Sequence, residues 1–433
     1  MRTRSSSRIL SAAVIVAGAV GLAIGGVSLA TKAKADEALV HYDGNTRDYW
    51  EHPPGDWYMG DETAEQHGER PYPGQPTPTP GDELVKLVKE NIKTQPGFHI
   101  EVWASGLDCV REMAWGGDGT LYAGCWTDHV FAITDDGSKR TAKVIIKGLR
   151  QPTGIGYYNG ALYVTDIDKI YKYADIDKTR DSNPQGTVVY SDFPPYTSHG
   201  WKYMVPDPQM PGWFYIPVGP PCNVCLPPSG TAQYRHVNPE QGLSEVAALG
   251  QRNSVGGAVD PRTGQLWFSE NARDWMGDGI PSDKLNHLAK YGQDFGYPYC
   301  HQGDLPDPKF NMGHKCSEFT PPALNLGAHM APLGMKFYTG FGTESFPSQY
   351  HNNIFLAEHG GWNQRIHTGA RVERIQVDAD GTQVSEEPFA WGWIKDNKYW
   401  GRPNDIIISP KDGSMLVSDD QAGAIYRIWY DGK

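Results

Sequence analysis

The sequence predicts an all-β protein, a six-bladed β-propeller preceded by an irregular arm and a short helix. A unit of turn, apolar strand and small or acidic residues recurs six times, at spacings of roughly 40–60 residues with one wider gap of about 90, which suits propeller blades. Further strands flank the copies, for example Val130–Ile133 and Lys169–Tyr173. The chain has 50 glycines, 33 prolines and 12% aromatic residues, the composition of aromatic strands joined by many turns.

The first 35 residues have the layout of a secretory signal peptide. Arg2, Arg4 and Arg8 precede an uncharged apolar run over 9–30, and an A-x-A pattern ends at Ala35. The run is close to the roughly 20 residues of a membrane span, so an uncleaved N-terminal anchor is an open alternative. Either way we expect the body of the protein to be periplasmic or secreted.

The charge balance excludes one class of partner. Removing the five basic side chains of residues 1–35 takes the formal net charge from −12 to −17. Such a surface repels nucleic acid and anionic lipid, so no nucleic-acid partner is expected.

Residues 36–96 are predicted to form an irregular arm, a stiff linker and a helix. Residues 36–81 are rich in proline, glycine and acids but keep several aromatic side chains, so we expect them to lie against the main domain rather than to be disordered. Pro71–Pro80 is the stiff linker. Asp82–Lys93 has helical spacing of apolar residues, with Asp82 as a plausible N-cap.

The propeller is predicted over residues 97–433. The six copies of the unit span residues 117–124, 159–166, 211–219, 263–270, 351–358 and 412–419. The last strand, Ala424–Tyr430, is predicted to be the fourth strand of a blade. Ring closure is expected to bring Phe98–Trp103 next to the C-terminal strands and to protect both edges. A pair of β-sandwiches is the alternative, and six copies of one unit count against it.

A long insertion runs from Asp274 to Pro347. It is rich in glycine, proline, tyrosine and histidine, and long loops without structure of their own are usually functional or act as lids.

Six cysteines follow the predicted signal. In an exported protein an even number favours disulfides, and proximity suggests Cys109–Cys125, Cys222–Cys225 and Cys300–Cys316 among fifteen possible connectivities. Cys222 and Cys225 form a C-x-x-C without a following histidine, which excludes a c-type haem attachment. A structural bridge is preferred there, and a redox dithiol is possible.

Polar clusters recur where strands of the repeat begin or end, and a rigid sheet positions such residues well. One stretch, 250–299, contains Arg252-Asn253 and the acidic loop Glu270–Asp278. The others are 197–202 with His199, 358–365, 400–405 with Arg402, and His329 in the insertion.

These residue types suit particular chemistry, although each alone is more often an ordinary surface or loop residue. A histidine titrates near neutrality and suits general-base work. Arginines bind carboxylates with two parallel hydrogen bonds, so Arg252, Arg402 and Arg365 could make a local anion site. The oxygen-rich loop Glu270–Asp278 suits a hard cation such as Ca²⁺.

Several enzyme classes are excluded because their motifs are absent. The chain has no H-E-x-x-H, P-loop, G-x-S-x-G or dinucleotide-binding motif.

The order of the motifs resembles the glucose/sorbosone dehydrogenases, exported six-bladed propellers that use pyrroloquinoline quinone (PQQ). The resemblance covers about residue 97 to the C-terminus, and AHMAPLG, HGGWN and CNVC place the chain closer to the sorbosone branch. The other motifs that carry it are GFHIEVWASGL, RQPTGIGYYNGALYV, SHGWKYMVPDP, FYIPVG, GQRNSVGGAVDPRTGQLWFSEN, FGYPYC, EHGGWNQR and GRPNDIIISPKDGSMLVSDDQAGAIYRI.

The resemblance implies roles for particular residues. His199 would be the base that takes a proton from a sugar or aldehyde-hydrate hydroxyl while hydride passes to the quinone. Arg252 would lie near the quinone oxygens beside Asn253, and Arg402 would bind a PQQ carboxylate. The backbone of Asn271, Ala272 and Arg273 would hold a Ca²⁺ ion that bridges to PQQ.

Some family positions have changed in this chain. Ala272-Arg273 stands where the glucose-specific branch has Gly-Pro in the calcium loop, and Asn404 stands where that branch has a second arginine. Trp362, Asn363 or Arg365 could substitute for a PQQ-contacting lysine of the fifth blade. Gln151 lies near a family glutamine with a one-residue shift.

The resemblance therefore implies a PQQ-dependent dehydrogenase that oxidises an aldose or a sugar aldehyde such as L-sorbosone. It would pass electrons to a cytochrome or quinone acceptor, with the quinone performing the redox step. Two alternatives stay open, because fold alone does not fix function. One is a metal-dependent propeller lactonase, and the other is a non-catalytic propeller that binds sugar or protein.

Overall fold

The computed structural model describes residues 77–432. The predicted signal peptide or anchor and most of the predicted arm lie outside these residues. Within the described part of the chain, no helix is long and apolar enough to cross a membrane.

Between residues 77 and 432, two short α-helices accompany the strands. Helix α3, Gly81–Asn91, buries Leu84 and Val88, as the apolar spacing predicts. Its N-cap is Pro80 and no side chain caps it, so the N-cap predicted at Asp82 is wrong. Asp82 lies in the first turn instead, where its charge is favourable beside the positive end of the helix dipole. Helix α4 is Ile176–Thr179.

The described residues form a six-bladed β-propeller, as predicted, and each blade has four antiparallel strands. Each blade is given from its innermost strand outward. The first blade is β3 (Val110–Trp115), β4 (Leu121–Cys125), β5 (His129–Asp135) and β6 (Arg140–Lys147); the second is β7 (Ile155–Tyr158), β8 (Ala161–Thr165), β9 (Ile170–Tyr173) and β10 (Thr187–Tyr190); and the third is β11 (Val205–Pro206), β12 (Phe214–Val218), β13 (Gln233–Asn238) and β14 (Leu243–Leu249). The fourth blade is β15 (Gly257–Val259), β16 (Leu266–Glu270), β17 (Ser282–Leu288) and β21 (Leu324–Ala328); the fifth is β22 (Pro332–Phe337), β23 (Ile354–Glu358), β24 (Arg371–Val377) and β25 (Val384–Trp391); and the sixth is β28 (Pro403–Ile408), β29 (Met415–Asp419), β30 (Ala424–Tyr430) and β2 (Phe98–Ser105).

Short elements complete the sheets. Strand β1 (Lys93–Thr94) extends the fifth blade beyond β25, and β18 (Gln293–Asp294) pairs in parallel with β14 of the third. The remaining elements are the pairs β19 (Cys300–His301) with β20 (Leu305–Pro306) and β26 (Ile394–Lys395) with β27 (Lys398–Tyr399), and the 3₁₀ turns Cys316–Glu318 and Ser348–Tyr350.

The innermost strands surround the propeller axis. Strand β3 contacts β7 and β28, β15 contacts β11 and β22, and β22 contacts β28. The six sequence repeats correspond to the second strands β4, β8, β12, β16, β23 and β29. These strands are buried along their whole length, which explains why they repeat as apolar runs.

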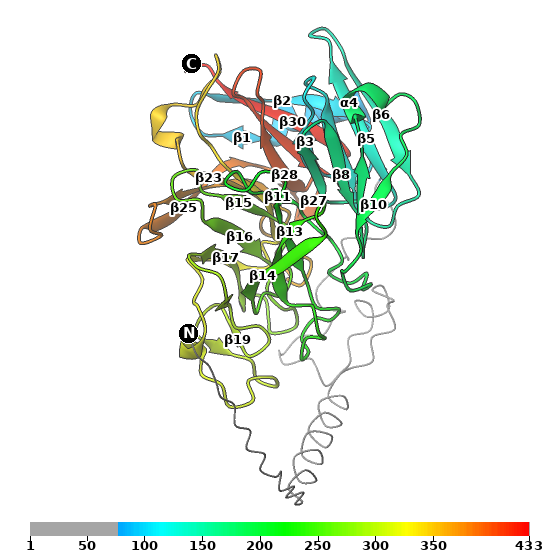
Figure 1. The fold of residues 1–433 in the computed structure, drawn as a ribbon. Coiled ribbons are helices and arrows are strands. Elements are labelled where there is room, and N and C mark those ends of the chain that lie inside the picture. The colour runs from blue at the N-terminus through cyan, green and yellow to red at the C-terminus, as the bar shows by residue number, and fades with distance from the viewer. Residues whose placement is uncertain (1–76, 433) are drawn as a thin grey trace, which may run out of the picture. The chain divides into compact units, whose positions relative to one another are not determined.

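The ring closes by pairing the two ends of the propeller. Strand β2 runs antiparallel to β30, from Phe98 opposite Tyr430 to Ser105 opposite Ala424, and Figure 1 shows the two side by side. This closure was predicted, but the place of β30 was not. Strand β30 is the third strand of the sixth blade, because β2 supplies the outermost strand.

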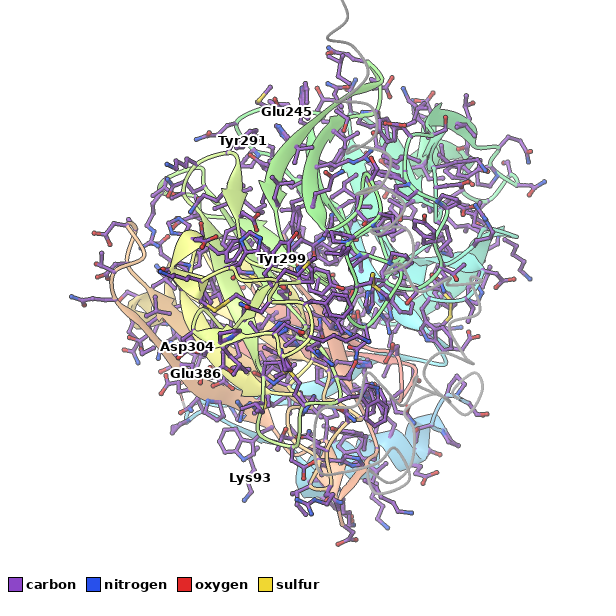
Figure 2. All side chains as sticks on the ribbon, turned by 90° about the horizontal axis from the view of Figure 1, so that it is seen from below. Lys93, Glu245, Tyr291, Tyr299, Asp304 and Glu386 are labelled. Carbon is purple, nitrogen blue, oxygen red and sulfur yellow. A yellow bond between two sulfur atoms is a disulfide. The ribbon has the colours of Figure 1, made fainter. Side chains whose placement is uncertain are left out.

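The segment predicted as a structureless insertion contains blade strands, so that prediction is wrong. It holds β17 and β21 of the fourth blade and β22 of the fifth. The irregular part is the excursion of residues 289–323 between β17 and β21, which includes Tyr299 (Figure 2). All three disulfides suggested by proximity are present: Cys109–Cys125, Cys222–Cys225 and Cys300–Cys316.

Buried polar groups connect the blades near the axis. Glu112 of β3 accepts hydrogen bonds from the backbone N–H groups of Ile155 and Met204, in the second and third blades. Asp405 of β28 accepts one from the N–H of Met113 and one from the hydroxyl of Tyr203. These bonds satisfy N–H groups that would otherwise be buried without partners.

Candidate active site

Charged side chains gather at one end of the blades, where the innermost strands begin and the second strands finish. Antiparallel pairing places these positions together, as Val110 opposite Cys125 and Pro403 opposite Asp419 show. We call this the arginine end. Its buried charged or titratable side chains include Arg111, His199, Lys202, Arg252, His359, Arg402 and Asp420.

His199 precedes the innermost strand of the third blade and is 4% exposed. Its Nδ1 lies 2.7 Å from the carbonyl oxygen of Pro220. Because a carbonyl only accepts, Nδ1 carries the proton and Nε2 keeps the basic lone pair. Burial, with Arg252 nearby, holds the pKa of His199 well below its ordinary value. The imidazole is therefore neutral at pH 7, in the tautomer that a general base acting through Nε2 requires.

Arg252 lies before β15 and is 3% exposed. Its Nε donates to the carbonyl of Asn223 at 2.7 Å, and one terminal nitrogen donates to the Asn223 side-chain oxygen at 2.9 Å and to Asp274 at 3.1 Å. The other terminal nitrogen donates to the carbonyls of Asn271 at 3.2 Å and Ala272 at 2.7 Å. All five N–H groups of the guanidinium thus have protein acceptors.

Two of these acceptors are backbone oxygens predicted to hold calcium. A Ca²⁺ ion on the carbonyls of Asn271 and Ala272 would lie beside the Arg252 guanidinium, and like charges at such range repel strongly. As arranged, these residues do not fit the predicted metal. The third predicted ligand residue, Arg273, is 1% exposed and pairs with Asp307 at 2.6 Å.

Asn253 belongs to the same strand entry. Its carbonyl accepts hydrogen bonds from the backbone N–H of Asn271 at 2.8 Å and from the Asn271 side chain at 3.1 Å. Asn253 therefore joins the start of the innermost strand to the end of β16, and its side chain is only partly buried.

Arg402 lies at the corresponding place in the sixth blade. Its Nε donates to the carbonyl of His359 at 2.9 Å, a terminal nitrogen donates to the carbonyl of Gly360, and the guanidinium stacks on Tyr399. His359 in turn pairs with Asp420 at 2.7 Å. Burial, and then the nearby Arg402, lower the pKa of His359 to about 4, so this second imidazole is also neutral at pH 7.

Arg111, which the sequence did not single out, completes this group. It donates to Asp420 through Nε at 3.0 Å and through a terminal nitrogen at 2.9 Å, and it lies over the ring of Trp201. Together with Arg252 and Arg402, it gives the arginine end buried arginines from the first, fourth and sixth blades.

Buried polar atoms at this end lack a hydrogen-bond partner among residues 77–432. They are the hydroxyls of Thr153, Ser198 and Ser254, the Gln151 side-chain oxygen and the Asn363 side-chain nitrogen. Buried polar groups are normally paired, so this concentration indicates a place where a polar ligand supplies the partners. The side-chain oxygen of Asn363 accepts a hydrogen bond from the backbone N–H of Trp275 at 2.7 Å. Trp362 packs edge-on against the Trp275 ring.

Two further candidates from the sequence have local partners. The Nε2 atom of His329 lies 2.9 Å from the carbonyl oxygen of Gly277. Arg365 is a surface residue that pairs with Asp278 at 2.8 Å, with 58% of its side chain exposed.

Sequence reasoning missed Arg111, Lys202, Asn223 and Asp420 as site residues. Lys202 is 2% exposed and donates to the carbonyl of Gly200, and burial lowers its pKa to about 7. Asn223 lies within the C-x-x-C motif and Asp420 directly follows the sixth repeat, so both had a signal in the sequence. Nothing in the sequence marked Arg111, which stands inside an ordinary strand.

The sequence model of the TrAA12-like family matches residues 92–430 of this chain. The chain belongs to the TrAA12-like family. An uncharacterised protein of Borreliella burgdorferi is 31% identical over 357 residues, covering 79% of this chain and 92% of that protein. The family resemblance predicted from the motifs is confirmed.

Other similar proteins share less sequence with this chain. A PQQ-dependent pyranose dehydrogenase of Coprinopsis cinerea is 26% identical over 286 residues, which is 50% of this chain but only 38% of that protein. A Trichoderma reesei structure of Carbohydrate-Active Enzymes Family AA12 has a TM-score of 0.68 at 18% identity, covering 79% of this chain and 98% of its own. The PQQ domain of the Coprinopsis enzyme has a TM-score of 0.67 at 19% identity, covering 81% and 98%. These structures show the same propeller fold.

Proposed function

We propose that the chain is a PQQ-dependent dehydrogenase that oxidises an aldose or sugar aldehyde, L-sorbosone-like in class, in the periplasm or outside the cell. The observation that carries the proposal is His199, a buried neutral imidazole whose basic Nε2 is fixed by a hydrogen bond from Nδ1 to Pro220. The named relative from Coprinopsis supports the cofactor and the sugar class.

The residues at the arginine end fit PQQ, a planar tricarboxylate. Arg402 supplies positive charge, and Gln151, Asn253 and Asn363 supply polar groups, two of which have buried atoms without partners among the described residues. Trp362 supplies an aromatic surface beside them. Buried cations and oriented amides of this kind suit a polyanion.

When bound, PQQ supplies a two-electron acceptor for hydride. The protein's part is acid–base chemistry and positioning. His199 takes the hydroxyl proton of the substrate at Nε2, and the resulting imidazolium keeps its Nδ1–H bond to Pro220. Arg252 fixes the loop that contains Asn271 and Ala272. No step is assigned to calcium, because the Arg252 guanidinium engages its predicted oxygens.

The test is reconstitution of the purified protein with PQQ, followed by reduction of an artificial acceptor with a panel of aldoses, alcohols and aldehydes. We expect turnover with at least one aldose or aldehyde, and no turnover with any of them would refute the proposal. His199→Gln should lower turnover by about 10²–10⁴-fold, the usual contribution of a general base, while PQQ titration shows little change in affinity.

The pH dependence gives a second check on His199. A base must be deprotonated to act, and the pKa of His199 lies well below 6.5. Turnover of the wild type should therefore show no decline as the pH falls from 7.5 through 6.5. A decline centred near 6.5 would contradict the buried, neutral histidine.

The lactonase alternative finds no specific support. Such enzymes hold a divalent ion through side chains. Among the His, Cys, Asp and Glu side chains of residues 77–432, the one group of three that lies close enough together to share an ion is Cys109, Cys125 and His129. Two of its members are joined in a disulfide. Lactone hydrolysis without PQQ would nevertheless identify this activity in the same assay.

A further inference from the structure

One short loop contacts both predicted catalytic residues. It is Gly219–Cys225, which follows β12 and contains the C-x-x-C motif that the proposed chemistry leaves without a role. The loop is buried throughout, although no strand runs through it.

The loop fixes the tautomer of His199. The carbonyl of Pro220 is the acceptor of the His199 Nδ1–H, at 2.7 Å. If this carbonyl moved away, the neutral imidazole would be free to place its proton on Nε2, and the basic lone pair would then point away from the substrate side.

The same loop holds Arg252 from the other side. Asn223 accepts from Arg252 through its backbone oxygen at 2.7 Å and its side-chain oxygen at 2.9 Å. That side-chain oxygen also accepts the backbone N–H of Asp274 at 2.8 Å, while the Asn223 amide donates to the Asp274 carbonyl at 3.1 Å. Asn223 is therefore the contact that fixes Arg252 against the loop after β16.

Gly219 brings the two residues together. A Cβ at this position would lie 2.6 Å from the Cβ of His199 and 2.8 Å from the carbonyl oxygen of Arg252. Only a residue without a side chain allows so close an approach, so the loop packs directly between the base and the arginine.

The disulfide closes this loop over four residues. Cys222 is bonded to Cys225, and the Cys225 N–H donates to the hydroxyl of Tyr297 at 3.0 Å. A cross-link limits the conformations open to the segment it spans. Asn223 is one of the two residues inside the ring.

We propose that the Cys222–Cys225 loop is a positioning device that fixes the tautomer of His199 through Pro220 and the orientation of Arg252 through Asn223. Its relevance to turnover rests on the proposed function, but the positioning itself does not. Asn223 and the disulfide are positioning elements, since they act through His199 and Arg252.

The experiment uses the full chain without cofactor, labelled with ¹⁵N in histidine and arginine. Imidazole correlation spectra, assigned with His199→Gln, report the tautomer of His199. The exchange rate of the terminal guanidinium N–H groups of Arg252, assigned with Arg252→Lys, reports the contacts of that side chain. In the wild type we expect the Nδ1–H tautomer of His199 and slow exchange of the terminal N–H groups of Arg252.

The variants separate the two contacts. Asn223→Ala keeps the disulfide and the backbone oxygen that accepts the Arg252 Nε–H, but it removes the side-chain oxygen that accepts from a terminal nitrogen. It should accelerate exchange of the terminal N–H groups of Arg252 by about tenfold, the scale of one lost charged hydrogen bond. Asn223→Asp keeps a side-chain oxygen as the acceptor for the terminal nitrogen of Arg252 and should restore most of the slow exchange. Cys222→Ser with Cys225→Ser should accelerate Arg252 exchange and also populate the Nε2–H tautomer of His199.

A matched control removes another disulfide. Cys300→Ser with Cys316→Ser deletes a bridge of the 289–323 excursion and should leave both signals at their wild-type values. The proposal is overturned if Asn223→Ala, or the folded Cys222/Cys225 variant, gives wild-type spectra. If the spectra change as expected but no variant or wild type turns over sugar with PQQ, the proposed function fails while the positioning role stands.

Discussion

Arg252 shows how a single side chain can decide whether a metal fits. Its five N–H groups engage oxygens of Asn223, Asn271, Ala272 and Asp274. The Asp274 carboxylate supplies an ion pair at 3.1 Å in a buried setting. These oxygens form a cation site, and the cation they hold is the guanidinium.

Replacing Arg252 should exchange one cation for another. Arg252→Ala leaves Asp274 without its buried partner, which should cost about 3–5 kcal/mol of folding free energy. The freed oxygens suit Ca²⁺, so added CaCl₂ should raise the melting temperature of this variant by mass action. The wild type should melt at the same temperature in CaCl₂ and in EDTA. The measurement is thermal unfolding of the cofactor-free proteins.

The matched control is Arg402→Ala. Arg402 is equally buried, but its side chain donates to two backbone carbonyls, of His359 and Gly360, while its backbone N–H donates to Asp419 at 2.8 Å. This variant should lose stability without any recovery in CaCl₂. Calcium stabilisation of the wild type would show instead that the ion displaces Arg252.

The sequence could indicate residues of the site but not their contacts. His199, Arg252 and Arg402 each stand about ten residues before a copy of the repeat, and the structure places them at one end of the propeller. Their partners are set by three-dimensional packing. Asn223 and Arg252 are hydrogen-bonded at a sequence separation of 29 residues, and Asp420 and Arg111 at a separation of 309. A local sequence pattern cannot predict contacts at such separations.

At the scale of elements, the propeller is closed by β2 and β30. Phe98, at the start of β2, is 5% exposed. The centroid of its ring lies no more than 5.0 Å from the ring centroids of four other aromatic residues, Phe346, Tyr350, Phe389 and Tyr430. The first three belong to the fifth blade or its 3₁₀ turn. Phe98 therefore joins the N-terminal strand of the ring to the neighbouring blade as well as to its own sheet.

Phe98→Ala should weaken this closure. Loss of a buried phenylalanine costs about 3–5 kcal/mol through lost burial and the cavity left behind. Guanidinium unfolding would measure the loss, and His99→Ala, whose side chain is 40% exposed, is the neighbouring control. A difference below 1 kcal/mol between the two variants would show that the closure depends on backbone pairing alone.

The elements differ in how well the sequence predicts them. The second strands are continuous apolar runs with a turn before each, so the six blades could be counted from them. The innermost strands are harder to find, because β11 has two residues and β15 has three. Strand β17 begins with Ser282-Asp283-Lys284, all of which are buried. Because polar residues of this kind are typical of loops, the sequence pattern did not indicate a strand there.

At the scale of the whole molecule, carboxylates near the axis connect distant blades. Glu112 joins the first blade to the second and third, and Asp405 joins the sixth to the first and third. Lys336 of the fifth blade donates to the Tyr203 hydroxyl at 3.1 Å. Five blades therefore share one polar network, in which each acceptor satisfies groups from other blades.

Glu112 provides the test of this network. Glu112→Ala leaves the backbone N–H groups of Ile155 and Met204 without their acceptor, and each buried unpaired donor costs about 1–3 kcal/mol. We expect a loss of about 2–6 kcal/mol in guanidinium unfolding, whereas Glu112→Gln keeps an acceptor oxygen and should lose less. Glu245→Gln, at a carboxylate that is 53% exposed, should be neutral.

The pH dependence distinguishes the network from simple packing. Burial, and then the nearby Asp405, raise the pKa of Glu112 well above its ordinary value. A raised folded-state pKa gives stability that is complete at low pH and is lost as the pH rises through that value. The stability of Glu112→Gln relative to wild type should therefore increase between pH 5 and pH 9. A constant difference over this range would mean that Glu112 is ionised in the folded protein at every pH tested, so that Lys336 and the surrounding N–H groups outweigh its burial.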